Sequence, residues 1–312
     1  MNSAQDSLLS QVKQINGTRD AELKIPAKSV KSRSGLMKFS SYILALRPWS
    51  LSGSLMPTLL GSTLAYKYPG AMDFSYITLV LTGIDNRKSD DRTLVDHILT
   101  KDEVVSLGAL LYFAGCVGFI LLTAFSPAKM EHLALVYFGG LSSSFLYTGG
   151  IGLKYIALGD ILILIIFGPV SVLFAFMSQT GRLEWATIYY AIPLALNTEA
   201  ILHSNNTRDM EVDRKAGIVT LAILIGHTCS HVLYAFLLFT PYIMFIIMTI
   251  KYSKWFILPL VTLPKAFKIE KQFRTKDIAD IPRKTAKLNL FFGILFVMSC
   301  SIVPNIPYIV KR

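Results

Sequence analysis

The residues best suited to chemistry lie in the string NNTRDMEVDR (205–214), where Asn205, Asp209 and Asp213 recur at intervals of four. On an α-helix each interval of four overshoots a full turn by only about 40°, so the three side chains line one face. Two carboxylates and an amide oxygen on one face suit Mg²⁺, which takes oxygen ligands and commonly links carboxylates to substrate phosphates. A solvated loop with charge pairs four residues apart is the alternative interpretation.

A second cluster, GIDNRKSDDRT (83–93), mixes acidic and basic residues and contains Asp85 and Lys88. If both clusters lie at the same mouth of a helical bundle, their acids can hold two or more Mg²⁺ ions around a diphosphate. Arg208 and Lys88 are then candidates to bind the remaining diphosphate oxygens. Taken alone, the second cluster is better explained as an ordinary cytosolic loop.

Other polar residues lie within or beside apolar stretches. Arg47 is inside the first such stretch, where a charge is costly unless it faces a cavity, a substrate or the membrane surface. The string YTGGIGLKY offers Tyr147 and Lys154 for a diphosphate or aromatic pocket, and it lacks the third glycine of a dinucleotide-binding loop. Asp160 begins the next apolar stretch and is a candidate of the same kind, with a helix N-terminal acid as the plain alternative.

Histidine and cysteine residues give no metal signature. Glu199 and His203 are four residues apart, as in half of a zinc site, but no third ligand is near, so a packed polar pair is the favoured interpretation. The three cysteines, Cys116, Cys229 and Cys300, lie far apart in apolar stretches and indicate packing rather than redox chemistry.

The composition excludes several classes of protein. The chain is 53% hydrophobic and 16% charged, whereas a soluble domain carries about 25% charged residues. Its apolar residues form blocks of membrane-spanning length, which excludes a soluble enzyme, a disordered chain and a disulfide scaffold. The net charge of +11 in such a protein sets orientation more often than it binds nucleic acid. No zinc-finger spacing or RNA-binding signature is present, so we expect no nucleic-acid partner.

The apolar blocks predict an all-α fold, a polytopic transmembrane helical bundle within 41–310. Crossing the hydrocarbon requires about 20 apolar residues. The candidate spans are 41–66, 105–125, 132–148, 157–179, 186–203, 217–240 and 286–309, with one more at 241–267 that Lys251, Lys254 and two prolines interrupt. Residues 1–40 are polar and basic without the apolar core of a signal peptide, so we expect a disordered cytosolic tail.

The stretch 72–84 does not fit this pattern. Its dozen or so helical residues reach only about 18 Å, too short to cross. If this stretch crosses nonetheless, 23 Lys and Arg residues share the face of the N-terminal tail and seven lie on the other face. The positive-inside rule predicts that asymmetry for nine spans with a cytosolic N-terminus. The charges therefore require a second span that is truncated here, which indicates a missing segment of about one helix.

Together these residues resemble the UbiA family of intramembrane prenyltransferases. The resemblance rests on LALRPWS around Arg47, on KSDDRTLVD (88–96), on SFLYTGGIGLKYIALGD (144–160) and above all on AIPLALNTEAILHSNNTRDMEVDRKAGIVTLAILIG (191–226). It covers roughly 40–310. It implies nine helices around a cavity that opens to the bilayer, with two aspartate-rich motifs facing each other at the cytosolic mouth.

The resemblance also assigns roles to the polar clusters. It implies that Asn205, Asp209 and Asp213 form the second motif and hold Mg²⁺ with an isoprenoid diphosphate. The first motif of the family, Asn-x-x-x-Asp followed by Gly-x-Asp, survives here only as Gly83 and Asp85. The missing part coincides with the place where length and charge disagree. A splice variant, a faulty gene model and a real inactive product are all open explanations.

The implied activity is transfer of a geranylgeranyl group from its diphosphate to a naphthoquinol ring (menadiol), which gives menaquinone-4, a form of vitamin K. Arg47, Tyr147, Lys154 and Asp160 are then the candidates for contacts to the acceptor or the diphosphate. Because the first motif is broken, we expect strongly reduced or no activity. The alternative is an inactive isoform that acts as a membrane binding partner or sterol-linked regulator, with the endoplasmic-reticulum sterol reductase as one implied client. The endoplasmic reticulum or Golgi is the expected location, with mitochondria still open.

Overall fold

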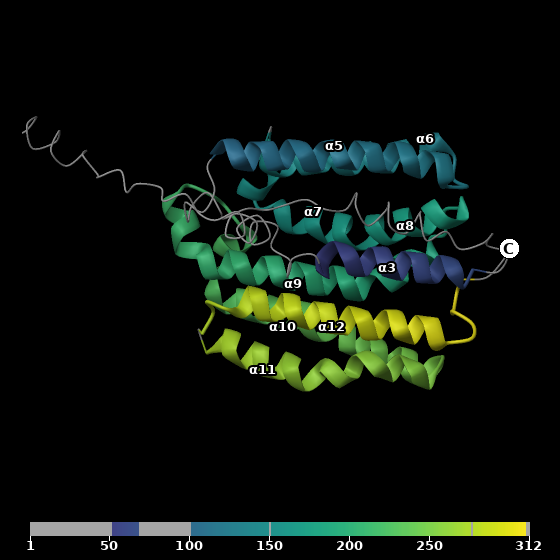
Figure 1. The fold of residues 1–312 in the computed structure, drawn as a ribbon. Coiled ribbons are helices and arrows are strands. Elements are labelled where there is room, and N and C mark those ends of the chain that lie inside the picture. Colours follow the sequence, from purple (N-terminus) through teal and green to yellow (C-terminus); the bar gives the residue numbers. More distant parts are fainter. Residues whose placement is uncertain (1–51, 69–100, 150, 276, 310–312) are drawn as a thin grey trace, which may run out of the picture. The chain divides into compact units, whose positions relative to one another are not determined.

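A computed structural model describes residues 52–68, 101–149, 151–275 and 277–309 (Figure 1). The chain divides into two units, Met1–Ile43 and Leu44–Arg312, and every described residue belongs to the second. The described elements are helices together with one isolated parallel bridge, and no strand occurs among them. The all-α prediction is therefore confirmed.

Several predicted features fall outside the described residues. They are the tail 1–40, the short stretch 72–84, Arg47, Asp85 and Lys88. Their assignments stay predictions, and so does the count of nine spans.

The described helices follow one another along the chain in a fixed order. They are α3 (Ser52–Tyr66), α5 (Lys101–Phe125), α6 (Met130–Thr148), η1 (Leu153–Tyr155), α7 (Gly159–Ile165), η2 (Ile166–Val170), α8 (Ser171–Thr180), α9 (Ala186–Lys215), α10 (Leu221–Lys251), η3 (Lys254–Thr262), α11 (Leu263–Arg274) and α12 (Ile281–Ile302). Four helical stretches among them are long and apolar enough to cross a membrane: Val105–Phe125, Gly159–Thr180, Leu221–Lys251 and Ile281–Ile302. These four stretches fit a multi-pass integral membrane protein.

The predicted boundary between the spans 217–240 and 241–267 is wrong. Helix α10 continues through Pro241 to Lys251, because a proline inside a membrane helix is tolerated where neighbouring helices pack around it. The break comes at Ser253, whose side chain accepts a hydrogen bond from the next turn and starts η3. The rest of the predicted span 241–267 belongs to η3 and to the beginning of α11.

The helix that carries the predicted span 186–203 extends beyond it. Helix α9 runs on to Lys215, so the polar motif of 205–214 is a continuation of the same helix. The backbone amides of the motif therefore keep their helical hydrogen-bond partners and need none from solvent or lipid.

The main core joins α3, α9, α10, η3 and α12. Three fully buried rings show how closely α10 and α12 pack. Phe245 of α10 meets Phe292 and Phe296 of α12 edge-on, with ring centroids 5.3 and 4.7 Å apart. Edge-to-face packing of this kind favours one arrangement of the helices over others. The core therefore fixes the helices that surround α9.

The helical stretch that starts at Gly159 is interrupted at Pro169 by the π-turn η2. Proline has no amide to donate, so a carbonyl one turn earlier loses its helical partner. Within this turn the hydroxyl of Ser171 donates to the carbonyl of Ile166 at 2.7 Å. The same carbonyl also accepts from the backbone amide of Ser171, so side chain and main chain together satisfy it within the turn.

Helices α3 and α8 approach each other closely at Gly61. A Cβ atom at this position would lie 2.4 Å from the carbonyl oxygen of Val172 and 2.8 Å from the Cβ of Ala175. Small residues allow such contact between membrane helices, whose association depends on packing rather than on a hydrophobic driving force.

We expect Gly61→Ala to destabilise the protein by about 1–3 kcal/mol, because the added methyl group meets backbone that cannot move aside. Thermal unfolding in detergent should show a melting temperature several degrees lower. Gly139→Ala is the matched control, since Gly139 lies in α6 with no neighbouring atom within 4 Å of an added Cβ. Equal melting temperatures for the two variants would contradict the close packing of α3 and α8.

Candidate active site

The polar motif occupies the last turns of α9. The helix is continuous from Ala186 to Lys215, so Asn205, Asp209 and Asp213 share one face, as their spacing predicts. Thr207 and Met210 pack on the opposite, buried side and are each 1% exposed. Burying that side holds the three oxygen-bearing side chains toward the partly exposed side of the helix.

Within the motif, Arg208 gathers the acceptor oxygens around its guanidinium group. Its Nε donates to Oδ1 of Asp209 at 2.8 Å, and its Nη2 donates to Oδ2 of Asp209 at 2.6 Å. The same Nη2 donates to Oδ1 of Asn205 at 2.7 Å. The Arg208 and Asp209 side chains are only 21% and 17% exposed, so this bidentate pair is shielded better than an ordinary surface ion pair.

This arrangement fits a divalent cation. The side chains of Asn205 and Asp209 already converge on one positive charge, and with Asp213 they offer only oxygen ligands, as Mg²⁺ prefers. Among the described residues no group of three or more His, Cys, Asp or Glu side chains is placed to hold a metal. The described residues of α9 therefore supply only part of the ligands that a metal site needs. Asp85 and Lys88 of the other cluster lie outside the described residues.

A parallel bridge ties the loop that carries Lys154 to the segment that follows α9. The amide of Ala157 donates to the carbonyl of Val219 at 2.8 Å, and the amide of Val219 donates to the carbonyl of Tyr155 at 3.0 Å. Because Val219 follows the last motif residue, Asp213, by less than two helical turns of chain, Lys154 is held at the same end of α9 as the motif.

Tyr147 and Lys154 lie together beside the start of α7. A Cβ added to Gly159 would lie 3.1 Å from Cε2 of Tyr147 and 3.1 Å from Cα of Lys154, so the absence of a side chain there permits the contact. The ammonium group of Lys154 lies 4.8 Å from the centroid of the Tyr155 ring. Tyr147 and Lys154 therefore both lie beside Gly159, and Asp160 is the next residue of the chain.

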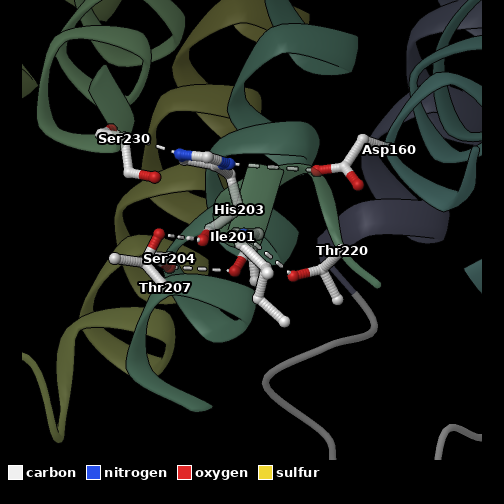
Figure 2. Close-up of polar contacts among 8 residues, drawn as sticks. Asp160, Ile201, His203, Ser204, Thr207, Thr220 and Ser230 are labelled. Atoms are coloured by element: carbon white, nitrogen blue, oxygen red, sulfur yellow. Dashed lines mark hydrogen bonds and ion pairs between the residues drawn. The ribbon is translucent and has the colours of Figure 1, made fainter. Parts of the chain in front are cut away.

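Asp160 faces the interior of the protein. In Figure 2 its carboxyl group points toward His203 of α9, and its Oδ1 lies 3.8 Å from His203 Nδ1. The other ring nitrogen of His203, Nε2, is 3.2 Å from the carbonyl oxygen of Ser230 in α10. Both members of the predicted pair, Glu199 and His203, interact with Asp160. Sequence spacing could not reveal this partner, because Asp160 is 43 residues away from His203.

These features define a class of protein: a multi-pass membrane protein whose polar, oxygen-bearing side chains gather at one end of a long helix. Comparison with known families makes the class specific. The model of the UbiA prenyltransferase family matches residues 80–295, and the chain belongs to that family.

Known relatives are similar over most of their length. The chain is 66% identical over 300 residues to the UbiA prenyltransferase domain-containing protein 1 homolog of Drosophila melanogaster, which covers 88% of this chain and 84% of that protein. It is 54% identical over 292 residues to UbiA prenyltransferase domain-containing protein 1 of Homo sapiens. The alignment covers 87% of this chain and 86% of that protein. The Danio rerio protein of the same name is 52% identical over 331 residues, with 98% of each chain covered.

Two solved structures share the fold. An apo structure of a UbiA homolog from Aeropyrum pernix K1 matches with a TM-score of 0.60 at 14% identity, covering 80% of this chain and 97% of that one. A structure of a digeranylgeranylglyceryl phosphate synthase matches with a TM-score of 0.52, also at 14% identity, covering 86% and 98%. At this level of identity the likeness shows the fold alone.

We expect Arg208→Gln to raise the affinity of the protein for Mg²⁺ alone by about tenfold, roughly 1.4 kcal/mol, because it removes the cation that occupies Asn205 and Asp209. Calorimetric titration of the purified chain with Mg²⁺ measures this change. Arg214→Gln is the control, because Arg214 is exposed and pairs with Glu211 instead. An unchanged Mg²⁺ affinity in Arg208→Gln would show that Asn205 and Asp209 are not ligands.

Proposed function

We propose that this protein binds an isoprenoid diphosphate at the end of α9 with Mg²⁺, and that its complete form transfers the geranylgeranyl (polyprenyl) group to a naphthoquinol ring. One observation carries the proposal beyond family membership: the amide of Asn205 and the carboxylate of Asp209 converge on a single cation. A site that gathers oxygens around positive charge suits a metal bridged to a diphosphate.

Each residue of the site has a part in this proposal. Asn205, Asp209 and Asp213 would hold the metal, with Asp85 contributing from the first motif. Bound Mg²⁺ neutralises the charge on the leaving diphosphate. Arg208, released from Asp209, would bind diphosphate oxygens through its planar fork.

Further positive charge would come from Lys154, which the backbone bridge holds at this end of α9, and from Lys88 of the first cluster. Tyr147 lies against the Lys154 loop and would contact the acceptor or the diphosphate. Arg47 is proposed for the same role from the first span.

The proposed reaction is electrophilic aromatic prenylation. The allylic C–O bond breaks and the diphosphate leaves with the electron pair. A ring carbon of the quinol then forms the new C–C bond and loses its proton. The apolar core around α3, α9 and α12 would exclude water from the reactive allylic group, and no nucleophilic residue is needed.

The chain as written is proposed to have little or no transferase activity. Only Gly83 and Asp85 of the first motif are present in the sequence. The alignment with the Danio rerio relative is longer than the 312 residues of this chain, so it contains positions where this chain has no residue. This supports the inference of a missing internal segment. We expect no transfer of geranylgeranyl to menadiol with Mg²⁺ present, and a normal rate in that assay would refute the expectation.

The missing segment also favours a second candidate function. A chain that retains the bundle without a complete metal cage could act as a membrane binding partner or sterol-linked regulator, with the endoplasmic-reticulum sterol reductase as a client. We propose the endoplasmic reticulum or Golgi as its location, with a mitochondrial membrane as the alternative, and a cytosolic N-terminus. Sequencing the messenger RNA across codons 75–90 separates an isoform from an error in the gene sequence.

We expect Asp209→Ala to weaken Mg²⁺-dependent binding of geranylgeranyl thiodiphosphate, a slowly ionising donor analogue, by at least about tenfold. Binding to the purified chain in nanodiscs measures the effect, and chelation of Mg²⁺ should weaken the wild type to the same level. Glu211→Ala is the control on the same helix, because Glu211 is exposed and pairs with Arg214.

Two results would contradict the metal assignment. One is full donor-analogue affinity in Asp209→Ala, and the other is full affinity of the wild type after chelation. In a protein with the missing segment restored, Asp209→Ala should abolish turnover while membrane insertion is retained.

A further inference from the structure

A strongly basic segment lies outside the candidate active site. Residues 263–287, which comprise α11 and the beginning of α12, contain eight Lys or Arg residues and three Asp or Glu residues. Their net charge of +5 is nearly half of the +11 carried by the whole chain. The proposed transferase reaction uses none of these residues, so their charge has a different role.

Helix α11 turns its charge outward. Ala266, Ile269 and Phe273 are buried in the bundle, whereas Lys268 and Lys271 are exposed. The helix is therefore amphipathic, with its apolar face packed against its neighbours. Figure 1 shows α11 beside α12, and the two helices are in contact.

Two side-chain contacts align α11 with α12. The ammonium group of Lys265 lies 5.0 Å from the centroid of the Phe291 ring. The ammonium group of Lys284 donates to Oε1 of Gln272 at 3.1 Å. The earlier residue of α11 thus meets the later residue of α12, so the two helices run antiparallel along this edge.

Lys268 of α11 and Lys287 of α12 lie between these two contacts. On each helix the contact residues are seven positions apart, and the lysine between them is three positions from one and four from the other, which places all three on one face. A rise of about 1.5 Å per residue brings the two lysines within about 2 Å of the same depth. Packed helices lie about 8–10 Å apart, so both long side chains reach one ligand between them.

The charge of these two lysines is not compensated within the described part of the chain. No carboxylate there forms an ion pair with Lys268 or Lys287. Glu270, the acid of α11, pairs with Arg274 at 3.0 Å. The other two acids of the segment follow α11, in its connection to α12. The edge therefore has two lysines at one depth that are open to an anionic ligand.

The surface next to the two lysines is apolar. Phe291, Ile294 and Met298 follow one another on the exposed face of α12 at steps of three and four residues. Ile257 and Val261 of η3, which precedes α11, are exposed as well. A pair of lysines that adjoins an apolar surface on a membrane helix fits a ligand with an anionic head and hydrocarbon chains.

We propose that the outer edge between α11 and α12 binds an anionic phospholipid, with the phosphate between Lys268 and Lys287 and the acyl chains along Phe291. Lysine binds phosphate as a point charge, and clustered basic residues at the end of a membrane helix attract anionic headgroups. Lys284, held by Gln272, adds positive charge on the side away from the apolar surface. The proposal is independent of the transferase function, since it concerns other residues and another ligand.

The wild-type chain in a neutral detergent gives the first test. It is titrated with phosphatidic acid, with phosphatidylcholine of the same acyl chains, and with glycerol 3-phosphate, the soluble headgroup without chains. We expect phosphatidic acid to bind at least about tenfold more tightly than either of the others, because it alone combines an anionic phosphate with acyl chains. Raising the NaCl concentration from about 0.05 to about 0.5 M should weaken the binding of phosphatidic acid and leave that of phosphatidylcholine unchanged.

Substitution of the two lysines gives the second test. The double variant Lys268→Gln, Lys287→Gln should prefer phosphatidic acid over phosphatidylcholine by less than about threefold, because both proposed phosphate ligands are lost. Lys251→Gln, Lys254→Gln is the matched control. It removes the same charge from two exposed lysines before η3 and at its start, and it should keep the wild-type preference. All four lysines are exposed, so neither double variant disturbs the core.

Three results would overturn the proposal. Equal affinity of the wild type for phosphatidic acid and phosphatidylcholine would leave the lysines only a role in membrane orientation. Glycerol 3-phosphate binding as tightly as phosphatidic acid would indicate a soluble phosphate ligand instead of a lipid. An equal loss of preference in the two double variants would show that net charge acts rather than the edge between α11 and α12.

Discussion

A helix in an apolar environment must satisfy its own backbone hydrogen bonds, and α9 is helical from Ala186 to Lys215, with Pro193 its one residue that has no amide to donate. Every side chain of the candidate site on α9 is therefore fixed in rotation and depth relative to the packed helices α3, α10 and α12. The motif of Asn205, Asp209 and Asp213 and the buried residues Glu199 and His203 lie on successive turns of this one helix.

The two polar sections of α9 differ in the charge of the groups that surround their carboxylates. At the end of the helix, Arg208 neutralises Asp209 and engages Asn205, so the acceptors there are satisfied until an incoming cation or diphosphate competes for them. Deeper in the bundle, the carboxyl group of Glu199 is buried beside that of Asp160, which in turn faces His203. The first section suits the metal and diphosphate proposed for it, whereas the second is closed off from solvent.

Much of the fold could be predicted from local pattern, because apolar length and helical period are local properties. The expected spans 105–125 and 132–148 match α5 and α6 closely. The largest error was the boundary placed between the spans 217–240 and 241–267, because α10 instead continues through Pro241 to Lys251. Packing against neighbouring helices tolerates that proline, and no local signal reports such neighbours. The shared face of Asn205, Asp209 and Asp213 was predictable for the same reason that the spans were.

By itself the sequence determined the helical class, the family and the candidate ligands of α9, since each depends on residue type and on spacing within a single helix. Tertiary structure alone decided that Asp160 faces His203, that the Lys154 loop is bridged to Val219, and that Gly61 admits the backbone of α8. Each of these contacts joins segments tens of residues apart. Their geometry follows from how buried side chains of several helices fill space together, and no periodicity within one helix encodes that.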